Sequence, residues 1–409
     1  MTQPNVFMLF VDSLRADAIF GDHIPTPNFD AYAASGAAFR QCVCTATTTT
    51  PSFSSILTGC YPPKHGVRGL KGYRMSPDVP TLAEIFGRAG YHTYAETTGP
   101  LLAETGVLRG FDEVHHRRGF RAPFFGWRDE VMGRMGEQSE PWLMLLHIWE
   151  VHNPFRPPPE YAKRWDRIGY ERVVSASDER LGPVFAALPE NTLVVLSGDH
   201  GEEYPDSQLG VWLSRLSRKS RGIFKPKNWW PSLDRKLAAR TVGHGFALHE
   251  HLIKVPLIIS GPDIPPTTIR DQVRHVDLVP TLADLAEIPF PEGLDGRSVR
   301  PLMMGGALPE EPAYMEAVGV KLEGRRIVGA RRREWKLLKP GGGKPALYKL
   351  NAANDEPDEK HNLYAIHPEV AEELERYIEQ VSSGTVAESG MSEEEEAVVE
   401  SHLRDLGYL

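Results

Sequence analysis

The segment NVFMLFVDSLRAD, residues 5–17, places an unbroken apolar run directly before two polar side chains. The run from Val6 to Val11 has the length of a strand that is buried on both faces of a largely parallel sheet. No basic region precedes this run, and it stops at Asp12. The segment therefore predicts neither a signal peptide nor a membrane span, but the first strand of an α/β protein.

Three further runs of the same kind recur between helix-like segments, at residues 142–149 (WLMLLHIW), 192–198 (TLVVLSG) and 255–260 (VPLIIS). The run at residues 192–198 leads directly into Asp199 and His200, just as the run from Val6 to Val11 leads into Asp12. In open α/β sheets, ligands collect outside the carboxyl ends of the strands. We therefore expect these polar residues to converge at one edge of the sheet.

Length and composition place the chain among globular enzymes. A chain of 409 residues predicts one large domain plus a smaller one, and 41% hydrophobic with 25% charged residues excludes disordered and fibrous classes. A net charge of -9 argues against nucleic acid as a partner, since phosphate binding favours a basic surface. Cys42, Cys44 and Cys60 form neither a disulfide framework nor a paired zinc pattern, which predicts a cytoplasmic protein. No apolar stretch reaches spanning length, so no transmembrane segment is expected.

The predicted organisation is a catalytic domain over residues 1–305 and a C-terminal subdomain over residues 306–409. Strands are expected in ARRREWKLLK (330–339) and PALYKL (345–350) of the second part. The last segment, SEEEEAVVESHLRDLGYL (392–409), predicts a helix whose first turn is acidic, as the helix dipole prefers.

Residues 213–241 differ from their surroundings, with nine Lys or Arg against the single acidic residue Asp234. We interpret them as a basic insertion that forms a lid at the rim of the cleft. Its charge would steer an anionic substrate, and Trp229 and Trp230 would cover an apolar part of that substrate or make peripheral contact with a lipid surface. The alternative is a solvated helical hairpin whose tryptophans pack on the body of the protein.

Several residues have the chemistry of an active site. Asp12, Asp199 and His200, together with a hydroxyl, would suit zinc or manganese. His152 in EVHNPF and His244 in GHGFALHEH are candidates for general acid or substrate contact. Taken singly, each of these residues is equally typical of a cap, a turn or an ordinary hydrogen-bonded histidine. His249 and His251 would share one face of a strand, or belong to a solvated turn.

The order of the motifs resembles the sulfatase-like branch of the alkaline phosphatase superfamily, and the resemblance runs nearly end to end. The first segment resembles the first metal strand of that family, and residues 49–59 resemble its nucleophile motif Cys-x-Pro-Ser-Arg with a Leu-Thr-Gly ending. Further matching segments follow in family order: GCYPPKHGV, AGYHTYAET, LHIWEVHNPF, LSGDHGEE, RHVDLVPTLADLAEIP and LYKLNAANDEPDEKHNL. The resemblance implies a large mixed, mostly parallel sheet between helices, alkaline phosphatase-like, with a smaller C-terminal αβ subdomain.

The departures from the family pattern bear on function. Thr49 stands where sulfatases carry the cysteine that becomes formylglycine, and Phe53 stands where they carry arginine. Ser13 replaces the second aspartate of the usual calcium site, and Thr98 lies near the position of a sulfate-contacting lysine. The ligands that remain are similar to the metal and threonine set in the family's phosphodiesterases and its phosphoethanolamine or glycerolphosphate transferases: Asp12, Thr49, Asp199 and His200.

The resemblance therefore implies that Thr49 is both nucleophile and metal ligand, with Thr48 and Thr98 as substrate contacts. The predicted activity is metal-dependent hydrolysis of phosphoric esters, diesters or monoesters, through a covalent phosphothreonine. Water can hydrolyse such an intermediate at phosphorus, whereas a sulfothreonine has no comparably easy exit. The expected cofactor is zinc or manganese rather than calcium, with a second metal left open, and the expected partner is an anionic ester. Alternatives are transfer of the phospho group to an alcohol, sulfuric ester hydrolysis, and a binding protein on a retired catalytic fold.

Overall fold

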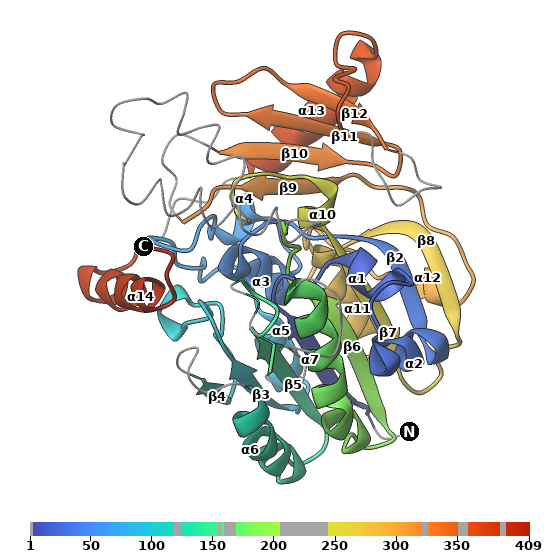
Figure 1. Cartoon of the computed structure of the whole chain (residues 1–409), viewed down its shortest axis with the longest axis vertical. Coiled ribbons are helices and arrows are strands. Elements are labelled where there is room, and N and C mark those ends of the chain that lie inside the picture. Colours follow the sequence, from blue (N-terminus) through green and yellow to red (C-terminus); the bar gives the residue numbers. More distant parts are fainter. Residues whose placement is uncertain are drawn as a thin grey trace.

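The computed structural model describes residues 3–117, 124–153, 155, 157–158, 169–204, 244–320, 326–350, 359–384 and 390–409. These residues form a large mixed sheet between helices and a smaller antiparallel sheet (Figure 1), so the predicted fold class is confirmed. The large sheet has eight strands in the order β4-β3-β5-β1-β6-β7-β2-β8. Their bounds are β1 Asn5–Val11, β2 Ala37–Val43, β3 His92–Thr97, β4 Glu113–His116, β5 Trp142–Ile148, β6 Thr192–Gly198, β7 Lys254–Ser260 and β8 Thr267–Arg274.

The apolar run that opens the chain is buried on both faces of this sheet, as predicted. In β1, Phe10 belongs to the core on one face and Leu9 to the core on the other, both with no exposed surface. Because successive side chains of a strand point to opposite faces, a strand covered on both sides must be apolar throughout. β7 runs antiparallel to β6 and β2, and it makes an otherwise parallel sheet mixed.

Helices cover both faces of the large sheet (Figure 1). The core around Phe10 is closed by helices that include α3, α5 and α11, and the core around Leu9 by helices that include α2, α6 and α7. The helices of this part are α1 Ala16–Phe20, α2 Pro27–Ser35, α3 Thr49–Thr58, α4 Pro62–His65, α5 Leu82–Arg88, α6 Phe124–Gly136, α7 Gly169–Ala186, α10 Glu250–Ile253, α11 Leu278–Leu285 and α12 Arg300–Met303, with the 3-10 turns η1 Ala103–Thr105 and η3 His275–Asp277.

The small sheet has the order β12-β11-β10-β9 and is packed against α13 (Pro368–Ser383). Its strands are β9 Ala313–Ala317, β10 Ile327–Arg331, β11 Trp335–Pro340 and β12 Ala346–Lys349. The prediction of one strand over residues 330–339 is wrong, because the chain turns between β10 and β11. The backbone N–H of Arg332 donates to the carbonyl of Trp335 at 2.7 Å, so the charged stretch forms the tip of a hairpin instead of a pleated strand. The boundary at residues 305/306 stays a prediction.

Ser392 precedes the acidic helix α14 (Glu393–Asp405) and caps it through two reciprocal hydrogen bonds with Glu395. The helix lies apart from the small sheet, at the side of the large one (Figure 1). There its buried side chains Val399 and Leu403 pack on Leu70. This position brings the residues that follow α14 close to the edge of the large sheet.

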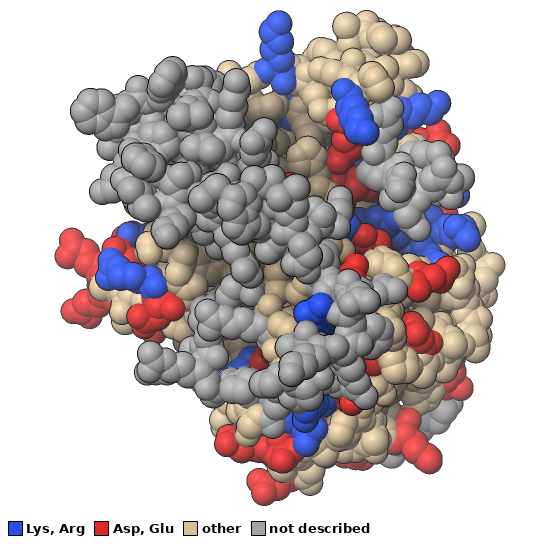
Figure 2. All heavy atoms as spheres, in the orientation of Figure 1, with Lys and Arg blue, Asp and Glu red and all other residues tan. Residues whose placement is uncertain are grey.

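On the face shown in Figure 2, acidic and basic side chains of the described residues are interspersed. Within the part of the chain that the structure describes, no helix combines the length and the apolarity that a membrane crossing needs.

A buried ionic cluster connects the two sheets. Glu250 of α10 accepts hydrogen bonds from Arg331 at 2.8 Å and from Lys336 at 3.1 Å. Burial alone would raise the pKa of Glu250, but these two cations outweigh burial and hold the pKa well below its ordinary value. The carboxylate is therefore ionised in the folded protein at any pH at which the protein is handled.

We predict that Glu250→Gln lowers the free energy of unfolding at pH 7 by about 3 kcal/mol, because it leaves two buried cations short of a partner. The folded pKa is depressed, so the contribution of Glu250 is complete above the ordinary pKa of 4.5 and is lost as the pH falls toward the folded pKa. The difference between wild type and variant should thus shrink by about 1.4 kcal/mol per pH unit below 4.5, as measured by urea unfolding. Glu372→Gln, on the exposed face of α13, is the control. A loss of unfolding free energy in Glu250→Gln that does not change with pH would contradict the ion pairing of Glu250.

Candidate active site

The candidate site lies at the ends of three neighbouring parallel strands, β5, β1 and β6. Val11 at the end of β1 lies opposite Ile148 of β5 on one side and Gly198 of β6 on the other. Asp12 and Asp199 follow directly after β1 and β6, so their fully buried carboxylates emerge next to each other at the carboxyl edge of the sheet. The structure therefore brings these two residues together, and His200 with them.

Ser13 fixes the orientation of both carboxylates. Its hydroxyl donates to Asp12 Oδ1 at 2.7 Å, and its backbone N–H donates to Asp199 Oδ1 at 3.0 Å. To do this the residue adopts a φ of +62°, a left-handed conformation that is uncommon for a residue other than glycine. The position that resembles the second aspartate of a calcium site is thus a hydrogen-bond donor here.

Thr49 is the first residue of α3, a helix in which every residue is buried. Its hydroxyl donates to Asp12 Oδ2 at 3.1 Å and lies 3.5 Å from His200 Nε2. The helix is held in place by Ser52, whose hydroxyl donates to the carbonyl of Asp199 at 2.6 Å. The positive end of the helix dipole therefore faces the carboxylates and any anion bound beside them.

His147 completes this group and was missed by the sequence reasoning. It lies in β5, where it is the polar residue of an otherwise apolar run, and its Nε2 is 3.7 Å from Asp12 Oδ2. Its Nδ1 is 3.2 Å from the carbonyl oxygen of Thr98, which fixes the proton on Nδ1. Burial lowers the pKa of His147 to about 4, so the ring is neutral and its Nε2 lone pair faces a carboxylate.

This arrangement fits a cation. The buried Nε2 of His147 and Oδ2 of Asp199 have no hydrogen-bond partner, and these atoms and an Asp12 oxygen lie within 4.8 Å of one another. Burial raises the pKa of Asp12, and the neighbouring Asp199 raises it further. His200 has a similar arrangement, since its Nδ1 donates to the Gly201 carbonyl at 2.8 Å and its Nε2 faces Asp199 Oδ2 at 3.4 Å. A ligand imidazole whose other nitrogen donates to a carbonyl is typical of transition-metal sites.

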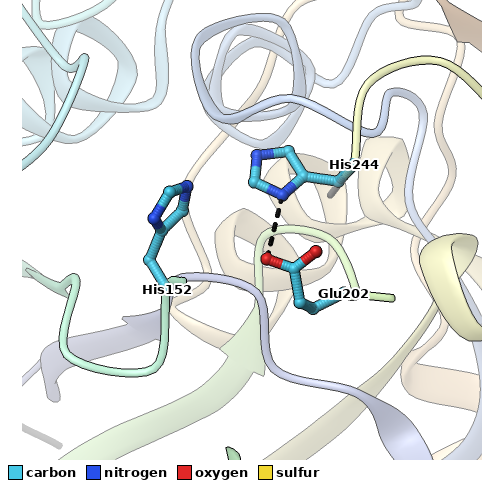
Figure 3. A group of neighbouring side chains, drawn as sticks. All are labelled: His152, Glu202 and His244. Atoms are coloured by element: carbon cyan, nitrogen blue, oxygen red, sulfur yellow. Dashed lines mark hydrogen bonds and ion pairs between the residues drawn. The ribbon is translucent and has the colours of Figure 1, made fainter. Parts of the chain in front are cut away.

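A second group lies next to the first and consists of His152, Glu202 and His244 (Figure 3). His244 Nδ1 is 3.2 Å from Glu202 Oε2, and the rings of His152 and His244 are 5.0 Å apart. Burial disfavours the charged forms of Glu202 and His244, but their mutual attraction outweighs burial. His244 lowers the pKa of Glu202, and Glu202 raises the pKa of His244. In contrast, burial lowers the pKa of His152 to about 3. Glu202 was not among the predicted residues, although it follows Asp199 and His200 in the same motif.

The other predicted residues have different surroundings. Thr98 donates to the carbonyl of His147 at 3.2 Å. Thr48 occupies the N-cap position of α3 without a capping hydrogen bond from its side chain, whose methyl group lies beside Gly245. His249 caps the short helix α10 and pairs with Glu359 at 3.2 Å, so a strand at this position is wrong. The predicted lid with Trp229 and Trp230, residues 213–241, lies outside the described residues.

Comparisons with known proteins identify the family of the chain. A family model described as Sulfatase matches residues 4–288, and one described as N-sulphoglucosamine sulphohydrolase, C-terminal, matches residues 245–384. The chain belongs to the sulfatase family.

Individual relatives are distant. An uncharacterized sulfatase, YidJ, of Escherichia coli strain K12 is 24% identical over 73% of this chain and 71% of its own. The choline-sulfatase of Rhizobium meliloti is 24% identical over 88% of this chain and 82% of its own. Among solved structures, a phosphonate monoester hydrolase from Silicibacter pomeroyi is similar with a TM-score of 0.71, at 19% identity over 94% of this chain and 96% of that one.

We predict that the purified protein holds a divalent transition metal through Asp12, Asp199 and His200, with Thr49 completing the set and His147 beside them. Asp199→Asn should reduce the metal content measured by elemental analysis at least about tenfold, because it removes a charged ligand from a buried site. Asp78→Asn changes an exposed aspartate and should leave the content unchanged. Equal metal content in both variants, or calcium bound only through backbone atoms, would exclude this site.

Proposed function

We propose that this protein hydrolyses phosphoric esters with the help of a divalent metal, with Thr49 as the nucleophile. The observation that carries the proposal is the position of the Thr49 hydroxyl. It donates to Asp12 Oδ2 at 3.1 Å, at the N-terminus of a buried helix and beside a metal-type cluster. An aliphatic hydroxyl is a poor nucleophile until a base or a cation favours its alkoxide. A metal held by Asp12, Asp199 and His200 would supply that activation and stabilise charge on the transferring oxygens.

The chain's own residues supply the remaining steps. The Thr49 hydroxyl passes its proton to Asp12 Oδ2, the acceptor of its hydrogen bond, which returns the proton when Thr49 is released. The Thr49 oxygen forms a bond to phosphorus, and the bond from phosphorus to the leaving oxygen breaks with its electron pair going to that oxygen. We assign His244 as the donor of the proton to the leaving oxygen, because Glu202 outweighs burial and raises its pKa, so that it holds a proton to a higher pH than an ordinary histidine. His152 is neutral and contacts the phosphoryl group. Water then attacks phosphorus, and the Thr49 oxygen leaves.

The choice of phosphorus over sulfur rests on how the intermediate breaks down. Formylglycine sulfatases release sulfate by elimination from a hydrate, and Thr49 has no second hydroxyl for that step. A phosphothreonine can be hydrolysed by attack at phosphorus. A phosphonate monoester hydrolase has a similar fold, which supports a phosphorus-containing substrate. Family membership favours sulfuric ester hydrolysis as the second candidate, and an alcohol in place of water would make the protein a phospho-group transferase.

The compartment is part of the same proposal. Cys42, Cys44 and Cys60 are buried and unpaired, which is compatible with a reducing cytoplasm. The substrate we propose is an anionic phosphoric ester, with the leaving group not assigned.

We predict that Thr49→Ala lowers turnover of a nitrophenyl phosphate ester or diester at least about a thousandfold, because it removes the nucleophile. The circular dichroism spectrum should be unchanged, because the substitution leaves folding intact. A panel of nitrophenyl phosphate, phosphodiester, phosphonate and sulfate esters, each tested with several divalent metals, identifies the ester class. We expect phosphorus esters to be turned over faster than sulfate esters by the wild type.

Thr48→Ala is the matched control in the same loop. It should retain most of the turnover, since Thr48 is at most a substrate contact. If Thr49→Ala stays active and Thr48→Ala does not, the nucleophile is Thr48. If both variants stay active, covalent catalysis from this loop is excluded.

A further inference from the structure

The hydroxyl of Tyr408 lies inside the candidate active site, although this residue follows α14 and is far from the site in sequence. It is 2.9 Å from His152 Nε2 and 3.5 Å from His244 Nε2. Burial raises the pKa of this phenol well above its ordinary value, the Asp12 carboxylate raises it further and the Thr49 hydroxyl lowers it, so both groups lie near the phenol. The phenol oxygen is therefore close to the proposed nucleophile and to both histidines at once.

The hydrogen bonds around this oxygen have defined directions. His152 Nδ1 is 2.6 Å from the carbonyl oxygen of Asn153, so the proton sits on Nδ1 and Nε2 is an acceptor. The Tyr408 hydroxyl accordingly donates to His152 Nε2. His244 Nδ1 faces the Glu202 carboxylate, and its Nε2–H, when present, points to the phenol oxygen. Tyr408 thus occupies a position that is suited to an oxygen atom between two imidazoles.

The position of the phenol is fixed by packing. The Tyr408 ring stacks on Trp149 with an interplanar angle of 13° and 6.5 Å between centroids. His402 Nε2 lies 2.9 Å from the carbonyl oxygen of Gly99, and Lys71 pairs with Glu400 at 2.5 Å. A ring that served only as a hydrophobic anchor on Trp149 would not need a hydroxyl pointing at the histidine pair.

We propose that Tyr408 is a substrate-contacting residue, whose hydroxyl donates to an oxygen of the transferred phosphoryl group beside the His152 and His244 rings. The inference rests on the proposed function and extends it to α14. Three buried carboxylates, Asp12, Asp199 and Glu202, oppose an anionic substrate, and a phenol adds a donor at this point without adding negative charge. Its present acceptor is a neutral imidazole nitrogen, and a phosphoryl oxygen is the stronger acceptor. Exchange of partners on substrate binding is therefore favourable.

The test uses Tyr408→Phe, which keeps the stacked ring and removes the hydroxyl. We expect the affinity for inorganic phosphate, measured by calorimetry on the full, metal-loaded chain, to fall at least about tenfold, the effect of losing a hydrogen bond to a charged group. The value of kcat/KM for a nitrophenyl phosphate ester should fall by a similar factor, with an unchanged Tm.

Two controls separate the hydroxyl from its surroundings. Tyr91→Phe removes a phenol hydroxyl that donates to the carbonyl of Pro4, away from the site, and should change neither quantity. Lys71→Ala removes ion pairs that attach α14 but leaves the phenol in place. It should lower the phosphate affinity and kcat/KM by less than about threefold, because partly exposed ion pairs contribute little.

Phosphate affinity of Tyr408→Phe equal to that of the wild type would overturn the inference. Higher affinity or faster turnover would also overturn it, because the hydroxyl would then merely block the site, and so would a lack of phosphate binding by the wild type. Phosphate binding does not require a covalent step, so this result is independent of Thr49. An active Thr49→Ala variant with a defect in Tyr408→Phe would instead refute the proposed nucleophile alone.

Discussion

The parallel pairing of β1 with β6 is the constraint on which the site depends. Because Val11 and Gly198 lie opposite each other, the chain has to place the carboxylates of Asp12 and Asp199 side by side with no exposed surface. Two buried anions at this distance are unfavourable without compensation. The surrounding features all provide it: the N–H of Ser13, the first turn of α3, and imidazoles whose free nitrogens face the carboxylates. A divalent cation is the group that satisfies this set most completely.

On our account, the chemistry at this edge differs from that of formylglycine sulfatases. Thr49 occupies the start of α3, where its single hydroxyl permits a covalent ester but no hydrate. Phe53, where the family pattern has arginine, is fully buried and packs edge-on against His147 with 4.9 Å between the rings. The arginine position therefore no longer supplies a charge to the substrate and instead supports a ligand-type histidine. On our account, the phosphoryl contacts pass to His152, His244 and Tyr408.

Local signals in the sequence were enough to predict the sheet and the aspartates. An apolar run of strand length followed by Asp is visible in β1 and β6 without any knowledge of their pairing, and parallel strands bring their carboxyl ends to one edge. The hairpin at Arg332 was missed because charged residues do not show a period that distinguishes a turn from an exposed strand. His147 could have been noticed as the polar residue of an apolar strand. Tyr408 carries no such signal, since its position depends on how α14 packs on Leu70.

The central claim is that Thr49 forms a covalent bond to phosphorus during turnover. The most direct measurement is acid quenching of the metal-loaded protein during hydrolysis of a nitrophenyl phosphate ester, followed by peptide mapping with mass spectrometry. Our account predicts one added phosphoryl group on Thr49, which disappears when the substrate is exhausted. Steady turnover of a phosphorus ester without any modified Thr49, or a phosphoryl group on a different residue, would contradict it.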